Sequence, residues 1–248
     1  MKIVRPYAKI MEPELLAGAL KRIEYAARVS HRSEENAGDS PEKFIRAVVL
    51  GHGDWSVTEH VSASVEFLVD RGITHEIVRH RLAAYTQEST RFVNYAKKMP
   101  PSFIYPIVGV ECEYCALGLE PLRSHSGIWY HVVKDGPPTV VEDCQYNNTW
   151  LNAIDEVEGT YRQLTLLEGW RPQEARSVFP NALSSKIIVT YNLRVWRHFF
   201  CMRTSKEAHP QMRQVTIPLL AEFQRLVPVL YEDIVPEARQ IDNICKGQ

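Results

Sequence analysis

Residues 79–92 read RHRLAAYTQESTRF, and they concentrate positive charge in a chain that is close to neutral overall. The stretch holds four basic side chains, Arg79, His80, Arg81 and Arg91. The whole chain of 248 residues carries 29 Lys and Arg against 30 Asp and Glu, a formal net charge of −1. Two interpretations are open: the cations bind an anionic ligand, or they form the solvent-exposed face of a helix, as most runs of charge do.

The elements around this stretch indicate the fold class. Residues 61–69 alternate apolar and polar side chains, which predicts a half-buried strand. Gly72 ends this strand, and residues 73–82 are predicted to form a short helix that carries the RHR tripeptide. A further strand is predicted over 92–95. Because strands and helices mix without a regular βαβ repeat, the pattern favours an α/β fold of the α+β-like kind.

Helices account for most of the remaining chain. We predict helices over 12–28, 41–50, 150–167, 172–176, 193–203 and 211–230, and a strand over 187–190. Ser40 is the expected N-cap of the second helix with Pro41 at its first position, and Pro218 marks a kink or a restart in the last helix. Residues 105–148 show few helical periods and are interpreted as an elaborated loop or insertion. A chain of 248 residues allows one large domain or two small ones.

The composition argues against several classes of protein. The chain is 45% hydrophobic and 24% charged, which is ordinary for a globular domain. The N-terminus lacks an apolar signal region, and no segment approaches the ~20 apolar residues of a membrane span. We therefore expect a soluble, cytoplasmic protein with no membrane partner. A pI near 6.8 argues against general binding of nucleic acid, whose readers are usually basic overall.

The five cysteines do not suggest a secreted disulfide framework. One group leaves a zinc site open as an alternative, namely Cys112, Cys115, Cys144 and His125 or His131, in which only the first two have CxxC spacing. Reduced structural thiols are the favoured interpretation, and no metal is assigned. Cys201 has apolar and aromatic neighbours in the sequence, which predicts a buried thiol rather than a nucleophile.

The RHR side chains point in different directions if residues 73–82 form a helix with about 100° between residues. His80 and Arg81 then fall on either side of the buried arc, and Arg79 points away from it. The three side chains therefore line a groove or face different ligands. They spread over ~200°, which one pocket in one subunit would not use fully.

Arg91 follows a polar run of hydroxyl, amide and acidic residues, YTQEST at 85–90. Hydroxyls, backbone N–H groups and a nearby arginine are a common composition for binding phosphate. Glu76 and Glu88 are the alternative, internal partners for the arginines of this region.

A second basic segment, YNLRVWRHFFCMR at 191–203, has the same character. On a helical wheel Arg194, His198 and Cys201 share a polar arc, whereas Arg203 projects into the apolar arc. A buried arginine needs an anionic or hydrogen-bonding partner, because an unpaired buried charge is very costly. That partner is either an acid of this chain or a charged group of a ligand.

Five segments together resemble the flavin-dependent thymidylate synthases. RHR followed by seven residues and then by Ser89 and Arg91 resembles the signature of that family. Four further segments resemble other family blocks in the right order: AARVSH at 26–31, TEHVSASVEF at 58–67, QEARSVFP at 173–180 and YNLRVWRHFFCMR at 191–203. The resemblance covers most of the chain apart from about 105–148. It implies a single domain over 1–248, with an elaborated loop or insertion in that stretch.

The resemblance implies a fold, a reaction and an assembly. The expected fold is that of the thymidylate synthase-complementing proteins, a central and mainly antiparallel sheet flanked by long helices. The implied enzyme is a methyltransferase that makes dTMP from dUMP. It uses 5,10-methylenetetrahydrofolate as carbon donor, FAD as redox cofactor and NADPH as reductant, without a cysteine nucleophile. Four subunits form a homotetramer whose active sites are shared between chains.

The resemblance also implies site residues. The positions that match flavin contacts are Ser56, Arg79, His80, Arg81, Gln87, Asn192, Arg194 and His198. Those that match nucleotide contacts are Glu76, Arg79, Gln87, Ser89, Arg91, Arg176 and Arg203. Arg203 has the expected catalytic role, the electrostatic stabilisation of a uracil deprotonated at N3. Gln87 departs from the family, in which glutamate is frequent at this position and glutamine at the next.

Two other functions remain as alternatives. A flavin- or nucleotide-binding homologue without synthase activity would keep the same residues. A nucleic-acid-binding protein would use the basic segments, although the net charge and the scattered aromatic residues argue against it.

Overall fold

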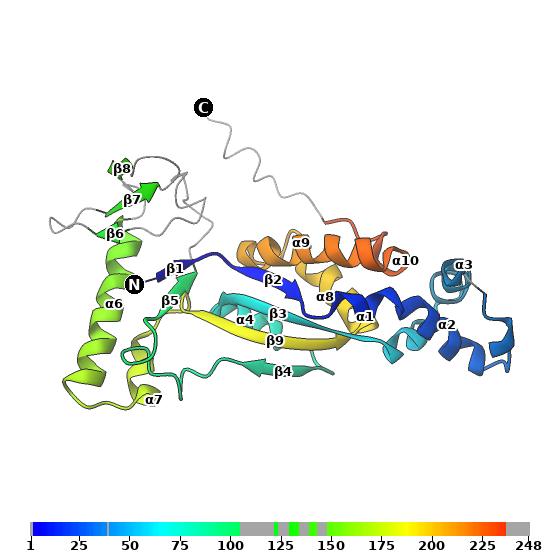
Figure 1. Cartoon of the computed structure of the whole chain (residues 1–248), viewed down its shortest axis with the longest axis horizontal. Coiled ribbons are helices and arrows are strands. Elements are labelled where there is room, and N and C mark those ends of the chain that lie inside the picture. The colour runs from blue at the N-terminus through cyan, green and yellow to red at the C-terminus, as the bar shows by residue number, and fades with distance from the viewer. Residues whose placement is uncertain are drawn as a thin grey trace. The chain divides into compact units, whose positions relative to one another are not determined.

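The computed structural model describes residues 2–38, 40–104, 122–123, 129–133, 139–142 and 148–236, with the backbone alone for 122–123, 129–133, 139–142 and 148 (Figure 1). The chain divides into two compact units. The first unit comprises Met1–Pro6, Leu68–His75 and Gln87–Ile187, and the second comprises Tyr7–Phe67, Glu76–Thr86 and Ile188–Gln248.

The largest sheet has four strands in the order β2 (Tyr7–Ile10), β3 (Ser62–Asp70), β9 (Ser184–Asn192) and β4 (Ala84–Gln87). The two central strands are antiparallel, since the hydroxyls of Ser64 and Thr190 lie 2.7 Å apart and Arg71 N donates to Leu183 O at 3.1 Å. The predicted alternation over 61–69 is confirmed, because its apolar members are buried at alternate positions. The mixed α/β fold with an antiparallel sheet is also confirmed.

The second unit carries most of the helices. They are α1 (Pro13–Ala17), α2 (Ala19–Val29), α3 (Pro41–Ile45), α8 (Leu193–Arg203), α9 (Pro210–Leu226) and α10 (Pro228–Tyr231), with a π-helical turn η2 (Arg46–Gly51) and two 3₁₀ turns, η1 (Glu34–Asn36) and η3 (Trp55–His60). Helix α8 begins and ends as predicted. Its Trp196, Phe199 and Phe200 are fully buried and contact Phe67 and Phe223. This aromatic core fixes the helix that carries Arg203.

The first unit contains α6 (Asn148–Leu166), α7 (Pro172–Ala175) and the 3₁₀ turn η5 (Arg176–Val178). Strands β1 (Lys2–Val4) and β5 (Ser102–Ile104) pair in parallel, and β6 (Leu122–Arg123), β7 (Trp129–Val133) and β8 (Thr139–Glu142) pair antiparallel. The predicted amphipathic helix after residue 148 is confirmed as α6. Its Tyr161 stacks on Phe179, and both rings contact Tyr95.

The helix before the RHR tripeptide is shorter than predicted. Helix α4 spans Arg71–Ile77, so residues 79–81 lie beyond it and the helical-wheel argument for their directions was wrong. The hydroxyls of Tyr85 and Tyr191 lie 3.2 and 3.3 Å from the carbonyl oxygen of Ile77. The same carbonyl accepts from the backbone N of His80 at 3.1 Å, so a hydrogen-bonded turn follows the helix. Leu82 then adopts a left-handed backbone with φ of 64°, which turns the chain into β4.

Other element boundaries also differ from the predictions. Residues 92–95 form turns rather than a strand, and the strand of this region is β4. The first predicted helix is interrupted at Gly18, a residue of low helix propensity. Helix α9 continues through Pro218. A new helix begins at Pro228, after Val227 leaves the helical conformation with φ of −139° and ψ of 61°. None of the described helices is both long and apolar enough to cross a membrane.

Candidate functional site

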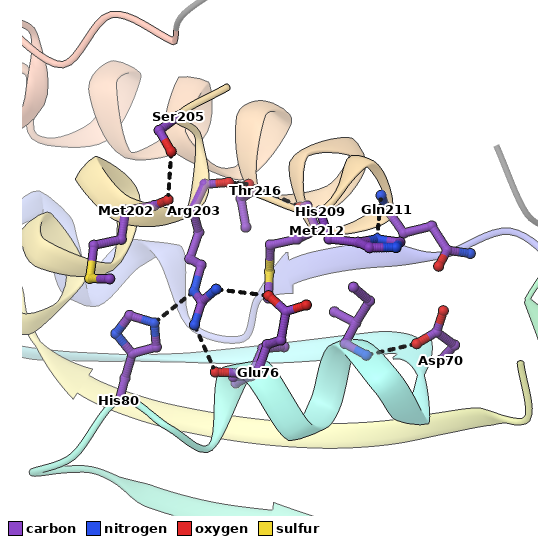
Figure 2. Close-up of polar contacts among 12 residues, drawn as sticks. Asp70, Glu76, His80, Met202, Arg203, Ser205, His209, Gln211, Met212 and Thr216 are labelled. Carbon is purple, nitrogen blue, oxygen red and sulfur yellow. Dashed lines mark hydrogen bonds and ion pairs between the residues drawn. The ribbon is translucent and has the colours of Figure 1, made fainter. Parts of the chain in front are cut away.

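Arg203, the last residue of α8, lies at the centre of a polar cluster in the second unit (Figure 2). Its Nη1 donates to Glu76 Oε2 at 2.7 Å, its Nη2 donates to the Glu76 carbonyl at 3.1 Å, and its Nε donates to His80 Nε2 at 2.9 Å. The Thr216 hydroxyl of α9 donates to the Arg203 carbonyl at 2.9 Å. Backbone and side chain are therefore both held in place before any ligand binds.

The ion pair with Glu76 settles which partner Arg203 has within its own chain. The exposed fraction of the side chain is 16% for Arg203 and 35% for Glu76. Of the two partners considered for a buried arginine, the internal acid is present. In the described part of the chain, one N–H on each terminal nitrogen of Arg203 remains without a partner.

His80 is the one buried member of the RHR tripeptide, with 6% of its surface exposed. Its ring lies edge-on to Phe199 at 5.0 Å and to His198 at 5.8 Å between centroids. Burial, together with the nearby charge of Arg203 and with His198, lowers the pKa of His80 to about 4. The imidazole is therefore neutral at pH 7. Because Nε2 accepts from Arg203, its proton lies on Nδ1.

Arg79 and Arg81 are exposed on either side of this buried ring. The turn that presents them is fixed by Tyr85, whose hydroxyl donates to the His80 carbonyl and lies 2.9 Å from the Tyr191 hydroxyl. Burial raises the pKa of Tyr85, which keeps this hydroxyl protonated. The two arginines thus face solvent from an anchored turn, where they are available to an anionic ligand.

The remaining flavin candidates of the second unit lie near the start of α8 and on η3. Asn192 caps α8, with its Oδ1 accepting from Val195 N at 2.9 Å, so its amide N–H groups are left for a ligand. Arg194 forms an ion pair with Glu59, with 2.6 Å between Nη1 and Oε1. Ser56 and His198 are exposed. Hydroxyl, amide, imidazole and guanidinium donors suit the polar and anionic groups of a flavin dinucleotide.

Gln87 lies in the first unit and its side chain is half-buried. Its Nε2 donates to Thr74 Oγ1 at 2.9 Å and to Ser185 Oγ at 3.0 Å. Glu88 accepts from the Tyr95 hydroxyl at 3.1 Å. Both N–H groups of the Gln87 amide are therefore used in hydrogen bonds to hydroxyls of the same unit. The Oε1 atom is the part of the side chain that can contact a ligand.

The first unit also holds three candidates for the nucleotide, Ser89, Arg91 and Arg176. Arg91 Nε donates to Gln173 Oε1 at 3.1 Å, and Arg176 Nη1 donates to Thr90 Oγ1 at 3.2 Å. A pocket of about 250 Å³ lies beside Arg176, lined by Arg71, Thr90, Arg176, Ser177, Phe179, Pro180, Asn181 and Leu183. No charged partner of Arg91 or Arg176 is present among the described residues.

Sequence reasoning missed three residues that shape these sites. Tyr85 holds the RHR turn, Thr74 orients Gln87, and Arg71 lines the pocket. Tyr85 and Thr74 act through contacts with residues outside their own element, so no local sequence pattern indicates their roles. Arg71 had a signal, a cation directly after a strand, but it stands outside the basic stretch.

Two expectations about cysteines have different outcomes. Cys201 is exposed, so the prediction of a buried thiol was wrong. It lies on the polar arc of α8 with Arg194 and His198, opposite the buried aromatic face. The alternative zinc site of Cys112, Cys115 and Cys144 lies outside the described residues.

Comparison with known proteins places the chain in a family. Residues 14–229 match the family described as thymidylate synthase complementing protein. A flavin-dependent thymidylate synthase of Corynebacterium efficiens is 29% identical over 236 residues, covering 93% of this chain and 83% of that protein.

Two solved structures share the fold. A UMP/dUMP methylase PolB from Streptomyces cacaoi bound with 5-Br dUMP has a TM-score of 0.66 at 21% identity, covering 94% of this chain and 96% of the other. A flavin-dependent thymidylate synthase from Helicobacter pylori complexed with FAD and dUMP has a TM-score of 0.62 at 18% identity, covering 93% and 99%. With the family match over most of its length, the chain belongs to the thymidylate synthase complementing proteins, the flavin-dependent thymidylate synthases.

Proposed function

We propose that this enzyme methylates dUMP to dTMP, with 5,10-methylenetetrahydrofolate as carbon donor, FAD as redox cofactor and NADPH as reductant. The methylene group forms a bond to C5 of the uracil while its bonds to the folate nitrogens break and tetrahydrofolate leaves. The C5 hydrogen leaves as a proton, and two electrons from NADPH, together with a proton, reduce the transferred carbon to a methyl group. FAD supplies this two-electron chemistry when it is bound.

The observation that carries the proposal is the state of Arg203. Its guanidinium is positioned by Glu76 and His80, and each terminal nitrogen keeps one N–H in the described part of the chain. A planar cation with two adjacent donors suits the edge of a uracil anion. Stabilising negative charge on the ring raises the nucleophilicity of C5.

The residues proposed to hold FAD are those that match the family's flavin positions, Ser56, Arg79, His80, Arg81, Gln87, Asn192, Arg194 and His198. The exposed Arg79 and Arg81 offer charge to its pyrophosphate. The neutral His80 is a rigid polar edge rather than a cation, because its pKa is lowered to about 4.

The nucleotide phosphate is proposed to bind Ser89, Arg91 and Arg176, with Glu76, Arg79, Gln87 and Arg203 contacting the rest of dUMP. The proposal extends to a homotetramer in the cytoplasm, with active sites shared between chains. Large exposed apolar side chains on α1 and α2, among them Leu15, Tyr25 and Val29, support a further contact between chains. A solution mass near four times that of the 28.5 kDa chain is the expected result.

A flavin titration followed by nucleotide addition tests the proposal. The purified protein should be yellow or take up added FAD, and dUMP should then perturb the flavin absorbance in a saturable way. UMP is a useful comparison, because the Streptomyces cacaoi relative is described as a UMP/dUMP methylase. Absence of flavin absorbance after incubation with FAD would contradict the proposal.

A further inference from the structure

Arg71 holds a fixed place in the pocket of the first unit. It is the first residue of α4, and its backbone N donates to Asn181 O at 2.9 Å and to Leu183 O at 3.1 Å. Asn181 and Leu183 line the same pocket as Arg71. The next residue is Gly72, where a Cβ would lie 3.2 Å from Asp70 Oδ1 and 3.8 Å from Asn181 Cβ. The close approach of the two segments therefore sets the position of Arg71.

The charge of Arg71 is not balanced within its surroundings. Its side chain is half-buried, and its guanidinium makes no hydrogen bond or ion pair with any residue in the described ranges. The carboxylate of Glu88 accepts a hydrogen bond from Tyr95 instead. Holding a partly buried cation without a partner is costly, so such an arginine indicates a site for an anion.

A second arginine contributes to the same pocket. Among the described residues, the side chain of Arg176 makes one hydrogen bond, to the neutral hydroxyl of Thr90, which itself lines the pocket. Neither guanidinium group has a carboxylate partner in the described ranges. Together with the hydroxyl and amide groups of Thr90, Ser177 and Asn181, they suit a phosphate monoester dianion.

We infer that Arg71 is a further nucleotide-binding residue, which with Arg176 holds the 5′-phosphate of the pyrimidine nucleotide in this pocket. The inference rests on the proposed function for the identity of the nucleotide. It goes beyond that function in placing the phosphate between Arg71 and Arg176. Arg71 then contributes to the preference of the site for a nucleotide over the nucleoside that lacks the phosphate. The pocket itself requires only a phosphate dianion.

Calorimetric titration of the full chain with dUMP, deoxyuridine and inorganic phosphate tests this inference. Arg71→Gln should raise the Kd for dUMP by about 10-fold or more, which is the usual loss when a charged hydrogen bond is removed. It should weaken inorganic phosphate in parallel and leave deoxyuridine unchanged. Arg162→Gln is the matched control, because it removes one exposed positive charge from α6 in the same unit. It should keep the Kd for dUMP within about twofold of wild type.

Each outcome decides a separate point. Arg71→Gln binding dUMP as tightly as wild type, while Arg176→Gln binds it weakly, would overturn the role of Arg71. Wild-type protein that binds inorganic phosphate through Arg71 but does not bind dUMP would refute the proposed function and leave the phosphate pocket intact. Flavin uptake reports that each variant is folded. If Arg71→Gln does not fold, Arg71→Lys keeps the charge without the planar fork and should still weaken dUMP.

Discussion

Arg203 has the internal partner, one of the two kinds of partner that the sequence left as alternatives. It is paired with Glu76 inside the chain, and it keeps N–H groups for a ligand. The ion pair therefore positions the guanidinium rather than consuming it. Such positioning before binding is what electrostatic stabilisation of a developing anion requires, because no reorganisation is then needed during the reaction.

Replacing Arg203 should remove activity without removing the fold. Arg203→Ala is expected to lower dTMP formation by at least about 100-fold, since loss of one donor to a developing anion typically costs that much. Arg225→Ala, an exposed arginine of α9, is the control and should stay active. Turnover like that of wild type in Arg203→Ala would refute the catalytic role.

The depressed pKa of His80 predicts a loss of stability in acid. The imidazole titrates near 6.5 in the unfolded chain and at about 4 in the folded protein, so the unfolded state binds more protons between these values. The free energy of unfolding should therefore fall as pH drops from about 6.5 to 4, by up to about 1.4 kcal/mol per unit. Urea unfolding measured across this pH window should show this decrease in the free energy of unfolding for wild type but not for His80→Gln. An NMR titration that gives His80 a pKa near 6.5 would contradict it.

Thr74 explains why glutamine occupies position 87. The Thr74 hydroxyl donates its hydrogen to the Arg71 carbonyl at 2.9 Å, so it can only accept from residue 87. A carboxylate there would face the lone pairs of Thr74. We expect Gln87→Glu to lower the free energy of unfolding by about 1–3 kcal/mol in urea titrations. Thr74→Ala should relieve part of this cost in the double variant. Equal stability of Gln87→Glu and wild type would refute the explanation.

The turn after α4 is the element that presents the basic tripeptide. Tyr85 of β4 and Tyr191 of β9 both reach the carbonyl of Ile77, and Tyr85 also reaches that of His80. These hydroxyls add to the backbone turn in which Arg79 N donates to Glu76 O at 3.3 Å and His80 N donates to Ile77 O at 3.1 Å. The direction of Arg79 and Arg81 follows from this arrangement rather than from helical geometry.

Removing the Tyr85 hydroxyl should therefore weaken cofactor binding. Tyr85→Phe keeps the ring against Tyr191 and is expected to raise the Kd for FAD by about 10-fold, through the loss of about 1.4 kcal/mol of positioning. Fluorescence titration of FAD measures the change. Thr160→Val, which removes an exposed hydroxyl from α6, is the control. Lower thermal stability with an unchanged Kd would show that the hydroxyl serves the fold alone.

Elements with strong periodicity could be predicted from the sequence, and those set by distant contacts could not. Strand β3 and helices α6 and α8 were found because alternate or three-to-four spacing marks a buried face. The end of α4 was missed because the turn after it is held in part by tyrosines of β4 and β9, and Tyr191 is distant in sequence. Short strands such as β1 and β2 carry too few residues for a period to show. Among the site residues, the buried state of Arg203 followed from the wheel of α8, whereas its pairing with both Glu76 and His80 depends on tertiary structure.

The two compact units divide the candidate residues by role. Apart from Gln87, the positions that match flavin contacts lie in the second unit. The candidates for the nucleotide phosphate, Ser89, Arg91 and Arg176, lie in the first unit together with Arg71. The uracil candidate Arg203 lies in the second. The candidates for the phosphate and the candidate for the base of the nucleotide therefore belong to different units.

Release of tritium from C5 of labelled dUMP tests the central claim most directly, because the C5 hydrogen must leave when the new carbon bond forms. With FAD, NADPH and 5,10-methylenetetrahydrofolate present, the protein should release tritium and form dTMP in equal amounts, and omission of the folate should abolish dTMP formation. Saturable binding of FAD and dUMP with neither tritium release nor dTMP would contradict the claim. That result would indicate a nucleotide-binding homologue without synthase activity.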